Sequence, residues 1–410
     1  MNQSVDTFPI TEVRDQFPAL KRTYNGKVVT YFDGPGGTQV VKSSIDSITS
    51  YMMNGGANLH GAFPTSRETE DIIGEAKRAV ADFLGVKENE VAFGANMTSL
   101  ALSIARALGK NWGSGDEIVV TEIDHRANVD PWITMAEDRG IVVKWIPVNT
   151  KTLTLNLSNL NEIINENTRL VAVGLASNAV GTINDIQQIS KRAKEVGALI
   201  AVDAVHATPH LTIDRDALDI DILLCSAYKF FGPHVGIAAI KEKLFESIEP
   251  FKLKPAPTYI PDKLETGTQN HEGIAGIKPA IEFIASLGVG TSRSDQLRSG
   301  MARIEEYETF LVMKLREGLS LHEKVTLYQA SALVPKTPTV AFTVKGYTPL
   351  EVCQILSDNY GIFVADGHFY ATTLAEKLGI IECGSWVRAG IAPYNTEEEV
   401  EGLIKAIQTL

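Results

Sequence analysis

Residues 198–240 read ALIAVDAVHATPHLTIDRDALDIDILLCSAYKFFGPHVGIAAI and contain three short apolar runs, at 198–205, 221–227 and 235–240. Runs that are apolar at successive positions and end at turn residues are typical of strands buried on both faces of a parallel sheet. Earlier runs have the same character: EVAFG (90–94), EIVVTEI (117–123), VVKWIPV (142–148) and RLVAVGLAS (169–177). These runs together predict a seven-stranded sheet.

Helical patterns alternate with these runs. The segment 65–85 places its apolar residues on one stripe, as an amphipathic helix does. Segments 97–109, 132–140 and 186–197 also have helical character. This alternation predicts an α/β fold, with a large domain whose mostly parallel sheet is flanked by helices.

The C-terminal part follows a different pattern. A long polar helix is expected over about 292–318, and a strand–helix–strand–strand–helix order follows from 339 to 410. This order predicts a small α+β domain. We expect a large domain at 31–290, the small domain at 291–410, and an N-terminal segment, 1–30, that packs with the small domain.

Composition limits the possible partners. The chain has 410 residues, and its 38 basic and 50 acidic side chains give a net charge of −12, which disfavours a nucleic-acid partner. No apolar run is long enough to span a membrane, and the N-terminus does not resemble a signal peptide, so we expect a cytoplasmic protein. The cysteines, Cys225, Cys353 and Cys383, lack CxxC spacing, so neither a disulfide framework nor a metal site is predicted.

Lys229 follows the apolar run 221–227 closely and lies among Tyr228, Phe230 and Phe231. Most lysines in loops are simply solvated. Apolar surroundings, however, lower the pKa of an amine because they disfavour its charged form. A lowered pKa is what a lysine that condenses with an aldehyde requires.

Asp203 lies near the end of the run 198–205, at the edge where open α/β sheets bind ligands. It could instead cap a helix. An aspartate and a lysine that both follow strands match pyridoxal 5'-phosphate, in which the carboxylate pairs with the pyridinium nitrogen and the lysine forms the Schiff base.

Other side chains could complete such a site. The strand–turn–helix segment 90–109, with Asn96 in its turn, offers a helix N-terminus to a phosphate. His125 is either an ordinary surface or core histidine or a ring that stacks on the cofactor. Asn178, at another strand end, could reach the cofactor's phenolic oxygen. Arg388 is either a surface ion-pair partner or the bidentate holder of a substrate carboxylate.

These segments together resemble the class V aminotransferase family of fold type I pyridoxal-phosphate enzymes, in its cysteine desulfurase-like branch. The resemblance covers nearly the whole chain, from YFDGPGG (31–37) to the C-terminal helix. The motifs that carry it are, in order, GANMTS (94–99), DHRANVDPW (124–132), SNAVGTI (177–183), VDAVH (202–206), SAYKFFGP (226–233), ETGTQN (265–270) and VRAGIAPYNTEEEV (387–400).

The resemblance implies roles for the residues around the cofactor ring. By it, Lys229 is the Schiff-base lysine and Asp203 pairs with the pyridine nitrogen. His125 would stack on the ring, and Asn178 would contact the phenolic oxygen. Lys229, His125 and Asp203 are thus the expected catalytic residues.

The resemblance also implies how the phosphate and the substrate are held. Ser226 and the backbone at Asn96 and Met97 would bind the phosphate. Thr268 is similar to a threonine that reaches the phosphate of the neighbouring subunit, which implies a homodimer with shared active sites. Arg388 would bind the α-carboxylate of the substrate.

The sequence departs from desulfurases at three positions. His206 stands where they usually carry glutamine, and Tyr228 stands where they carry histidine; we expect both residues to bind the cofactor. In Gly-His-Phe-Tyr (367–370), Tyr370 takes the position of the catalytic cysteine, and we expect Tyr370 and His368 to bind substrate. A phenol does not replace a thiolate as a nucleophile toward sulfur.

The remaining residues predict an enzyme that acts on a small α-amino acid through an external aldimine, with Lys229 removing the Cα proton. We expect β-elimination of the C–S lyase type. The alternatives are a class V aminotransferase or amino-acid epimerase, a true cysteine desulfurase that uses another cysteine, and a non-catalytic protein that binds pyridoxal phosphate. A dinucleotide-dependent dehydrogenase is disfavoured because no GxGxxG follows the first strand.

Overall fold

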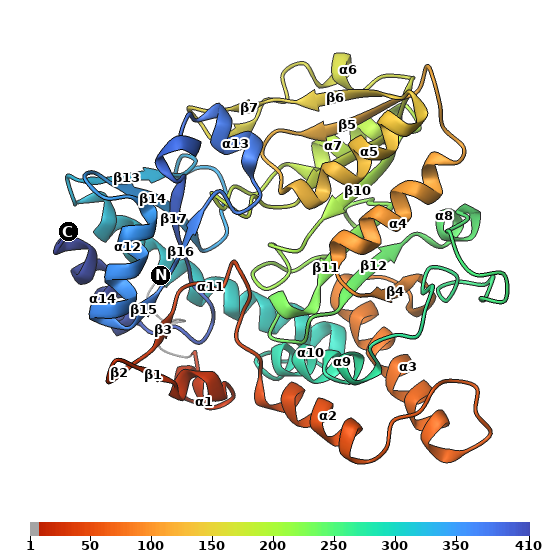
Figure 1. Ribbon diagram of the computed structural model, residues 1–410, viewed down its shortest axis with the longest axis horizontal. Helices are drawn as coiled ribbons and strands as arrows, with labels where there is room; N and C mark the ends of the chain where they lie inside the picture. The colour runs from red at the N-terminus through yellow and green to blue at the C-terminus, as the bar shows by residue number, and fades with distance from the viewer. Residues whose placement is uncertain (1–7) are drawn as a thin grey trace.

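The computed structural model describes residues 8–410, and all seven apolar runs form strands of one sheet (Figure 1). In spatial order the strands are β4 (Val91–Gly94), β12 (Gly236–Ile240), β11 (Ile222–Ser226), β10 (Leu199–Asp203), β9 (Thr168–Gly174), β5 (Glu117–Thr121) and β6 (Val142–Ile146). β12 is antiparallel to both of its neighbours, and the four pairs from β11 to β6 are parallel. The predicted α/β fold with a mostly parallel seven-stranded sheet is confirmed.

Helices cover both faces of this sheet, because the strands are apolar on both sides. One face packs on α4 (Met97–Gly109) and α5 (Asp130–Arg139), and the other on α3 (Pro64–Leu84), α7 (Ile186–Glu195) and α10 (Ile277–Ser286). In α7, Ile186, Ile189 and Ala193 form the buried stripe. The Asp185 carboxylate begins this helix by accepting a hydrogen bond from the Gln188 N–H.

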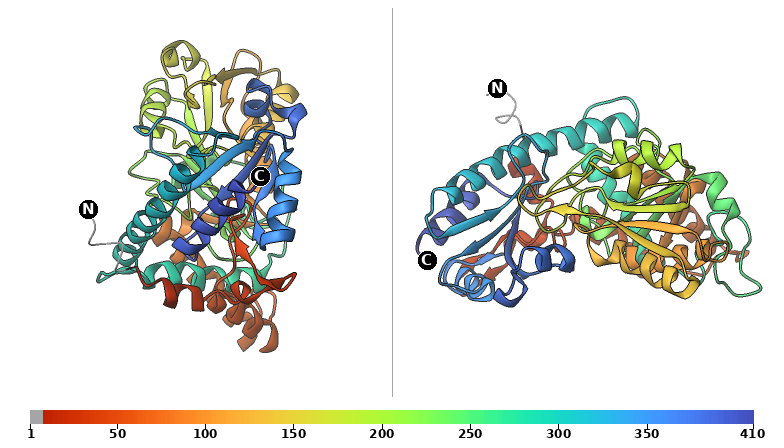
Figure 2. Two further views of the ribbon diagram at one scale, coloured as in Figure 1. Left: turned by 90° about the vertical axis from the view of Figure 1, so that its left-hand side faces the viewer. Right: turned by 90° about the horizontal axis from the view of Figure 1, so that it is seen from above.

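A second, antiparallel sheet of four strands lies in the C-terminal part. Its order is β13 (Val325–Tyr328), β14 (Thr339–Val344), β17 (Trp386–Gly390) and β16 (Ala365–Gly367). Helices α12 (Pro349–Ile355), α13 (Thr372–Lys377) and α14 (Glu397–Gln408) accompany it. The long helix α11 (Arg293–Ser320) packs against α10 at one end and α14 at the other, and so spans both parts (Figure 2).

The N-terminal segment lies against the C-terminal part. β3 (Thr30–Tyr31) pairs in parallel with β15 (Ile362–Phe363), and Arg14 Nη1 lies 2.8 Å from Glu399 Oε1. The first seven residues of the segment lie outside the described ones. The packing of 1–30 as a unit with the small domain and the domain boundaries after residues 30 and 290 stay predictions.

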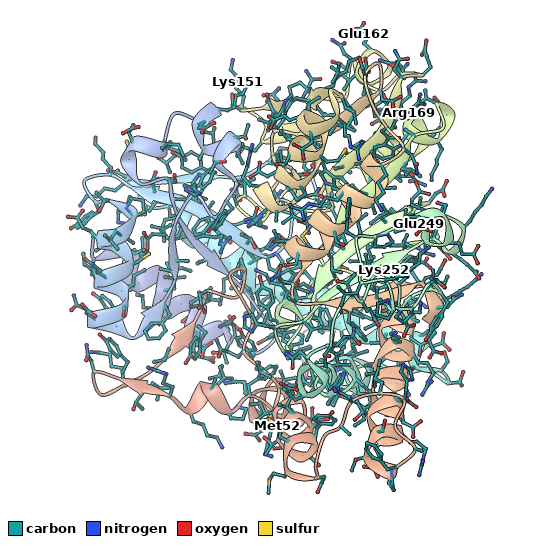
Figure 3. The ribbon with its side chains drawn as sticks, turned by 45° about the vertical axis from the view of Figure 1, so that its right-hand side comes forward. Met52, Lys151, Glu162, Arg169, Glu249 and Lys252 are labelled. Atoms are coloured by element: carbon teal, nitrogen blue, oxygen red, sulfur yellow. The ribbon has the colours of Figure 1, made fainter. Side chains whose placement is uncertain are left out.

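The other elements are α1 (Ile10–Asp15), β1 (Thr23–Tyr24), β2 (Lys27–Val28), α2 (Lys42–Met53), β7 (Val148–Asn149), β8 (Thr154–Leu155), α6 (Leu160–Ile163), α8 (Glu242–Ser247) and α9 (His271–Ala275). Charged side chains such as Lys151, Glu162 and Arg169 stand on the outer edge of the molecule, and Met52 at the end of α2 is also exposed (Figure 3). No helix within residues 8–410 is long and apolar enough to cross a bilayer.

Candidate active site

A cavity of about 350 Å³ opens at the carboxyl ends of the parallel strands. β9, β10 and β11 end at Gly174, Asp203 and Ser226, and these three residues line the cavity. Ligands bind at this edge of open α/β sheets because loops from successive strands converge there. All the predicted site residues except Thr268 and His368 contribute to the cavity wall, namely Asn96, Met97, His125, Asn178, Asp203, His206, Ser226, Tyr228, Lys229, Tyr370 and Arg388.

Lys229 is buried in a 3₁₀ turn (Ala227–Lys229) directly after β11. Its Nζ donates a hydrogen bond to Pro35 O. Burial, followed by the charge of Arg388, lowers the pKa of the amine to about 7, although Asp203 opposes this shift. A large share of the amine is therefore uncharged near neutral pH, which is the form that condenses with an aldehyde.

Asp124, which is buried, and Asp203, which is half-buried, place two carboxyl groups in the cavity wall. Burial raises the pKa of Asp203 to about 6, although a 2.8 Å hydrogen bond from the Val205 N–H opposes the shift. Burial, and then repulsion from Asp203, raise the pKa of Asp124 to about 7. Such a pair favours a cationic N–H donor, because a positive charge stabilises both carboxylates.

His125 lies at the beginning of a 3₁₀ turn (Arg126–Asn128) that follows β5. Its Nδ1 accepts a hydrogen bond of 3.0 Å from the Ala127 N–H. Burial, and then the charges of Lys229 and Arg388, lower the pKa of the imidazole to about 4. The ring is therefore neutral near pH 7, and its single proton is on Nε2 because Nδ1 is an acceptor. His125 thus offers a hydrogen-bond donor rather than a base.

His206 is a buried, neutral imidazole in the same wall, because burial lowers its pKa well below the usual value. Its Nε2 lies 3.0 Å from Thr337 Oγ1 and 3.1 Å from Thr339 Oγ1. The ring also meets His210 edge to face at 5.7 Å. These contacts connect the loop after β10 to the segment that begins β14.

The N-terminus of α4 forms a second wall. Asn96 Oδ1 caps the helix by accepting a 2.8 Å hydrogen bond from the Ser99 N–H, and the Met97 N–H donates to Ser226 Oγ at 3.2 Å. A Cβ at Gly236 would lie 2.2 Å from the Asn96 carbonyl carbon, so only glycine lets β12 pass this close. The arrangement presents N–H groups, a hydroxyl and the positive end of a helix dipole, which suit a phosphate.

Arg388 is buried on β17 and faces the cavity. Its Nη1 donates a 2.8 Å hydrogen bond to Asn178 O, and the guanidinium carbon lies 3.7 Å from the centre of the Phe369 ring. Burial lowers its pKa to about 9, so the group stays charged near neutral pH. No carboxylate within residues 8–410 forms an ion pair with it, so its burial fits a substrate carboxylate better than the alternative of a surface ion pair.

The Asn178 side chain holds the loop after β16. Its Nδ2 donates to Phe369 O at 2.8 Å, and its buried Oδ1 has no partner within the described residues. One N–H of the amide is thus used inside the protein, and Oδ1 and the second N–H remain for a ligand. The predicted contact with the phenolic oxygen of the cofactor stays a prediction.

Tyr370 lies at the mouth of the cavity, where 64% of its surface is exposed. Its ring stacks on His125, with the ring centres 5.2 Å apart and the planes 26° apart. His368 is outside the cavity wall, and its Nδ1 accepts a 3.1 Å hydrogen bond from the Tyr370 N–H. Tyr228, on another wall, stacks on His234 at 4.6 Å.

Thr268 lies away from the Lys229 cavity of its own chain. It is exposed in a separate surface cleft of about 410 Å³, which Ser99 and Ser103 of α4 also line. Its predicted role in a neighbouring subunit stays a prediction.

None of the three cysteines lines the cavity. Cys225 is buried in β11 on the face that packs against α3, α7 and α10, and burial raises the pKa of its thiol. Cys353 is half-buried on α12, and Cys383 is exposed in a 3₁₀ turn (Ile381–Cys383).

Two acidic residues of this region received no role from the sequence, although both lie in motifs that carry the family resemblance. Asp124 lines the cavity, and burial raises the pKa of Asp33, which the charges of Arg388 and Lys229 oppose. Each has a buried Oδ1 without a partner within residues 8–410. The sequence did contain a signal for both residues: Asp124 directly precedes His125, and Asp33 lies inside the glycine-containing segment 31–37.

Pyridoxal 5'-phosphate fits the residues present. The carboxyl pair of Asp203 and Asp124 has no cationic hydrogen-bond donor within the described residues, and a pyridinium N–H would supply one. The N-terminus of α4 with Ser226 suits the phosphate, and Lys229 supplies an amine with a lowered pKa. Each chemical part of the group thus has a matching set of side chains.

Comparison with known proteins places the chain in a family. The family model described as "Aminotransferase class-V" matches residues 30–403. Curated cysteine desulfurases from an Enterobacter species (strain 638) and from Yersinia pseudotuberculosis are each 30% identical to the chain over 98% of both sequences.

Solved structures agree with this result. A cysteine desulfurase from Thermococcus onnurineus is similar with a TM-score of 0.88 and 30% identity, over 98% of each chain. The Escherichia coli cysteine desulfurase CsdA has a TM-score of 0.86 at 24% identity, also over 98% of each chain, and supports the fold alone. The chain therefore belongs to the class V aminotransferase family, as a pyridoxal-phosphate-dependent enzyme related to the cysteine desulfurases.

Proposed function

We propose that this enzyme is a C–S lyase that acts on a small α-amino acid by β-elimination. The observation that carries the proposal is the composition of the cavity wall. It contains Lys229, Asp203, His125 and Arg388, but no cysteine sulfur from the described chain. Residues for binding and deprotonating an amino acid are thus present without a thiolate to accept sulfur.

Arg388, Lys229 and Asp203 have separate roles in the proposed reaction. Arg388 binds the substrate carboxylate with its planar guanidinium, which orients Cα. Lys229, whose pKa is lowered to about 7, accepts the Cα proton as general base. Bound pyridoxal phosphate supplies an electron sink for the charge left on Cα, and Asp203 stabilises the positive charge that makes the ring effective.

Departure of the β-substituent is assisted by a hydrogen-bond donor near the mouth of the cavity. His125 has its proton on Nε2, and the Tyr370 hydroxyl belongs to the ring stacked on it. A hydrogen bond from the His125 Nε2–H stabilises the departing sulfur, and the proton that Lys229 took from Cα passes to it, so that sulfur is released as a thiol. Addition of water then releases pyruvate and ammonium, so the overall reaction is a thioether amino acid plus water giving a thiol, pyruvate and ammonium.

The test is to incubate the cofactor-loaded enzyme with cysteine, cystine and thioether amino acids and to measure pyruvate, other keto acids and racemised substrate. We expect pyruvate. A keto acid that retains the β-substituent would favour the aminotransferase, and racemisation would favour the epimerase. In parallel, Lys229→Ala should change the visible absorption of the purified protein, and an unchanged spectrum would favour a non-catalytic binding protein.

A true desulfurase is the second candidate, because the curated relatives bear that name. Cys383 is the exposed thiol of this chain. A persulfide on the wild-type protein after incubation with cysteine, and its loss in Cys383→Ser, would support this candidate and contradict the lyase. Cys353→Ser is the matched control.

The proposal includes a homodimer in which Thr268 reaches the phosphate of the neighbouring active site. The exposed position of Thr268, outside its own cavity, supports this arrangement. Mixing inactive Lys229→Ala subunits with Thr268→Ala subunits should generate hybrid dimers with one intact site, and activity should increase. A monomer in sedimentation, or no gain on mixing, would contradict it.

A further inference from the structure

The loop after β16 holds two aromatic residues in an uncommon backbone conformation. Phe369 and Tyr370 have φ values of 52° and 59°, in the left-handed region that non-glycine residues rarely adopt. Conformations of this kind persist where surrounding contacts determine them, and they concentrate at ligand sites. The loop is therefore a fixed feature that points its side chains in a set direction.

Hydrogen bonds from the large sheet hold this conformation. The Asn178 amide donates to Phe369 O at 2.8 Å, and the Arg126 N–H donates to Tyr370 O at 2.9 Å. Within the loop, the Ala371 N–H donates to His368 O at 2.8 Å. Both carbonyl groups of the aromatic pair are thus bound by residues that follow β9 and β5.

The two rings cover the groups that the proposed mechanism uses. The centre of the Phe369 ring lies 3.7 Å from the Arg388 guanidinium carbon, and the Tyr370 ring stacks on His125 with the ring centres 5.2 Å apart. A substrate held by its carboxylate at Arg388, with Cα facing Lys229, must direct its side chain toward the mouth. Tyr370 is the exposed aromatic wall at that mouth.

We propose that Phe369 and Tyr370 determine specificity, and that the substrate is a cysteine thioether with an apolar or aromatic group on sulfur. This inference rests on the proposed lyase function. Thioether sulfur and aromatic rings both make favourable contacts with an aromatic face, whereas a free thiol gains little there. An open, solvent-facing mouth also admits a substituent larger than the hydrogen of cysteine.

The reaction balances without a further redox partner. Lys229 takes the Cα proton, the Cβ–S bond breaks with its electron pair on sulfur, and the proton held by Lys229 then passes to sulfur to complete the thiol, while the His125 Nε2–H stabilises the leaving sulfur by a hydrogen bond. Water then releases pyruvate and ammonium. Neither an oxidant nor a sulfur acceptor is consumed, which agrees with a cavity wall that contains no cysteine.

The experiment compares S-benzylcysteine, S-methylcysteine and β-chloroalanine as substrates of the cofactor-loaded enzyme. Pyruvate release gives kcat/KM for each. Binding is measured separately from the change in visible absorption with homophenylalanine and 2-aminobutyrate, which have no leaving group on Cβ. The variants are Tyr370→Ala, Tyr370→Phe, and Tyr24→Ala as a control tyrosine outside the cavity wall.

We expect wild-type enzyme and Tyr370→Phe to prefer S-benzylcysteine over S-methylcysteine and homophenylalanine over 2-aminobutyrate. In Tyr370→Ala the ratio of kcat/KM values and the ratio of binding affinities should each fall roughly 3- to 10-fold, because one aromatic contact is removed. In Tyr24→Ala both ratios should stay unchanged. Equal use of the two thioethers by the wild type, or a preference that survives in Tyr370→Ala, would overturn the inference. Absence of pyruvate from all three substrates would instead reject the lyase function, while the binding preference would still decide the role of Tyr370.

Discussion

The close approach of β12 to the phosphate cradle can be tested with Gly236→Ala. The new Cβ would lie 2.2 Å from the Asn96 carbonyl carbon and 2.6 Å from its Cα and carbonyl oxygen. Favourable separations between such atoms are about 3.5–4.0 Å, so the strand or the cradle must move by more than about 1 Å. All three obstacles are backbone atoms, and no rotamer change relieves them. We expect a destabilisation of about 1–3 kcal/mol, the usual cost of overpacking.

The displacement should also weaken cofactor binding, because it moves the N-terminus of α4 relative to Ser226. Titration of the cofactor-stripped protein with pyridoxal phosphate, followed by absorption, should give a Kd raised about 10-fold or more, as a change of about 1.4 kcal/mol predicts. Gly402→Ala in α14 is the matched control, since its Cβ meets nothing within 4 Å. It should stabilise the protein by about 0.5–1 kcal/mol and leave the Kd unchanged. Wild-type stability and Kd in Gly236→Ala would refute the steric argument.

Other expected outcomes follow from the charges in the cavity. Arg388→Lys should raise KM about 30-fold, from a loss of about 2 kcal/mol, with the cofactor spectrum unchanged; an unaltered KM would place the substrate carboxylate elsewhere. His125→Phe keeps an aromatic ring but removes the Nε2 donor, so kcat should fall about 100-fold while cofactor affinity changes little; an unchanged kcat would show that the leaving sulfur does not depend on this hydrogen bond. Cofactor capture by the stripped protein should accelerate as pH rises through about 7, because Lys229 loses its proton there. Because Arg388 lowers that pKa, Arg388→Gln should shift the midpoint upward; a downward shift would contradict the electrostatic account.

Local pattern predicted the large sheet well, because each strand is apolar on both faces and ends at a turn residue. The runs at 198–205 and 221–227 became β10 and β11 with Asp203 and Ser226 at their ends. Strand β13 and helix α13 of the C-terminal part were not predicted. β13 has three half-buried residues and an exposed one, so its pattern is weak, and α13 has only six residues.

Part of the candidate site was also predicted from local pattern, because several of its residues lie near strand ends. Asp203 ends β10, and Lys229 and His125 lie within four residues of the ends of β11 and β5, so sequence position alone places them at the ligand-binding edge. His368 was expected to bind substrate, but a neighbouring residue in a turn need not face the same way. With Tyr370 in the left-handed region, the loop aims the tyrosine ring at His125 and turns His368 toward the backbone.

Strand–helix periodicity and the spacing of a few polar residues by themselves predicted the α/β fold and the cofactor, and they placed Lys229, the proposed Schiff-base lysine, at a strand end. Those features depend on residues close in the chain, where burial on one face or at one strand end follows from local pattern. Only the tertiary structure decided the ionisation and pairing of the cavity groups. Burial raises the pKa values of Asp203 and Asp124, one N–H of the Asn178 amide binds Phe369 O, and Arg388 donates to Asn178 O with no salt bridge among residues 8–410. These properties depend on distances between segments up to 210 positions apart, which no local pattern contains.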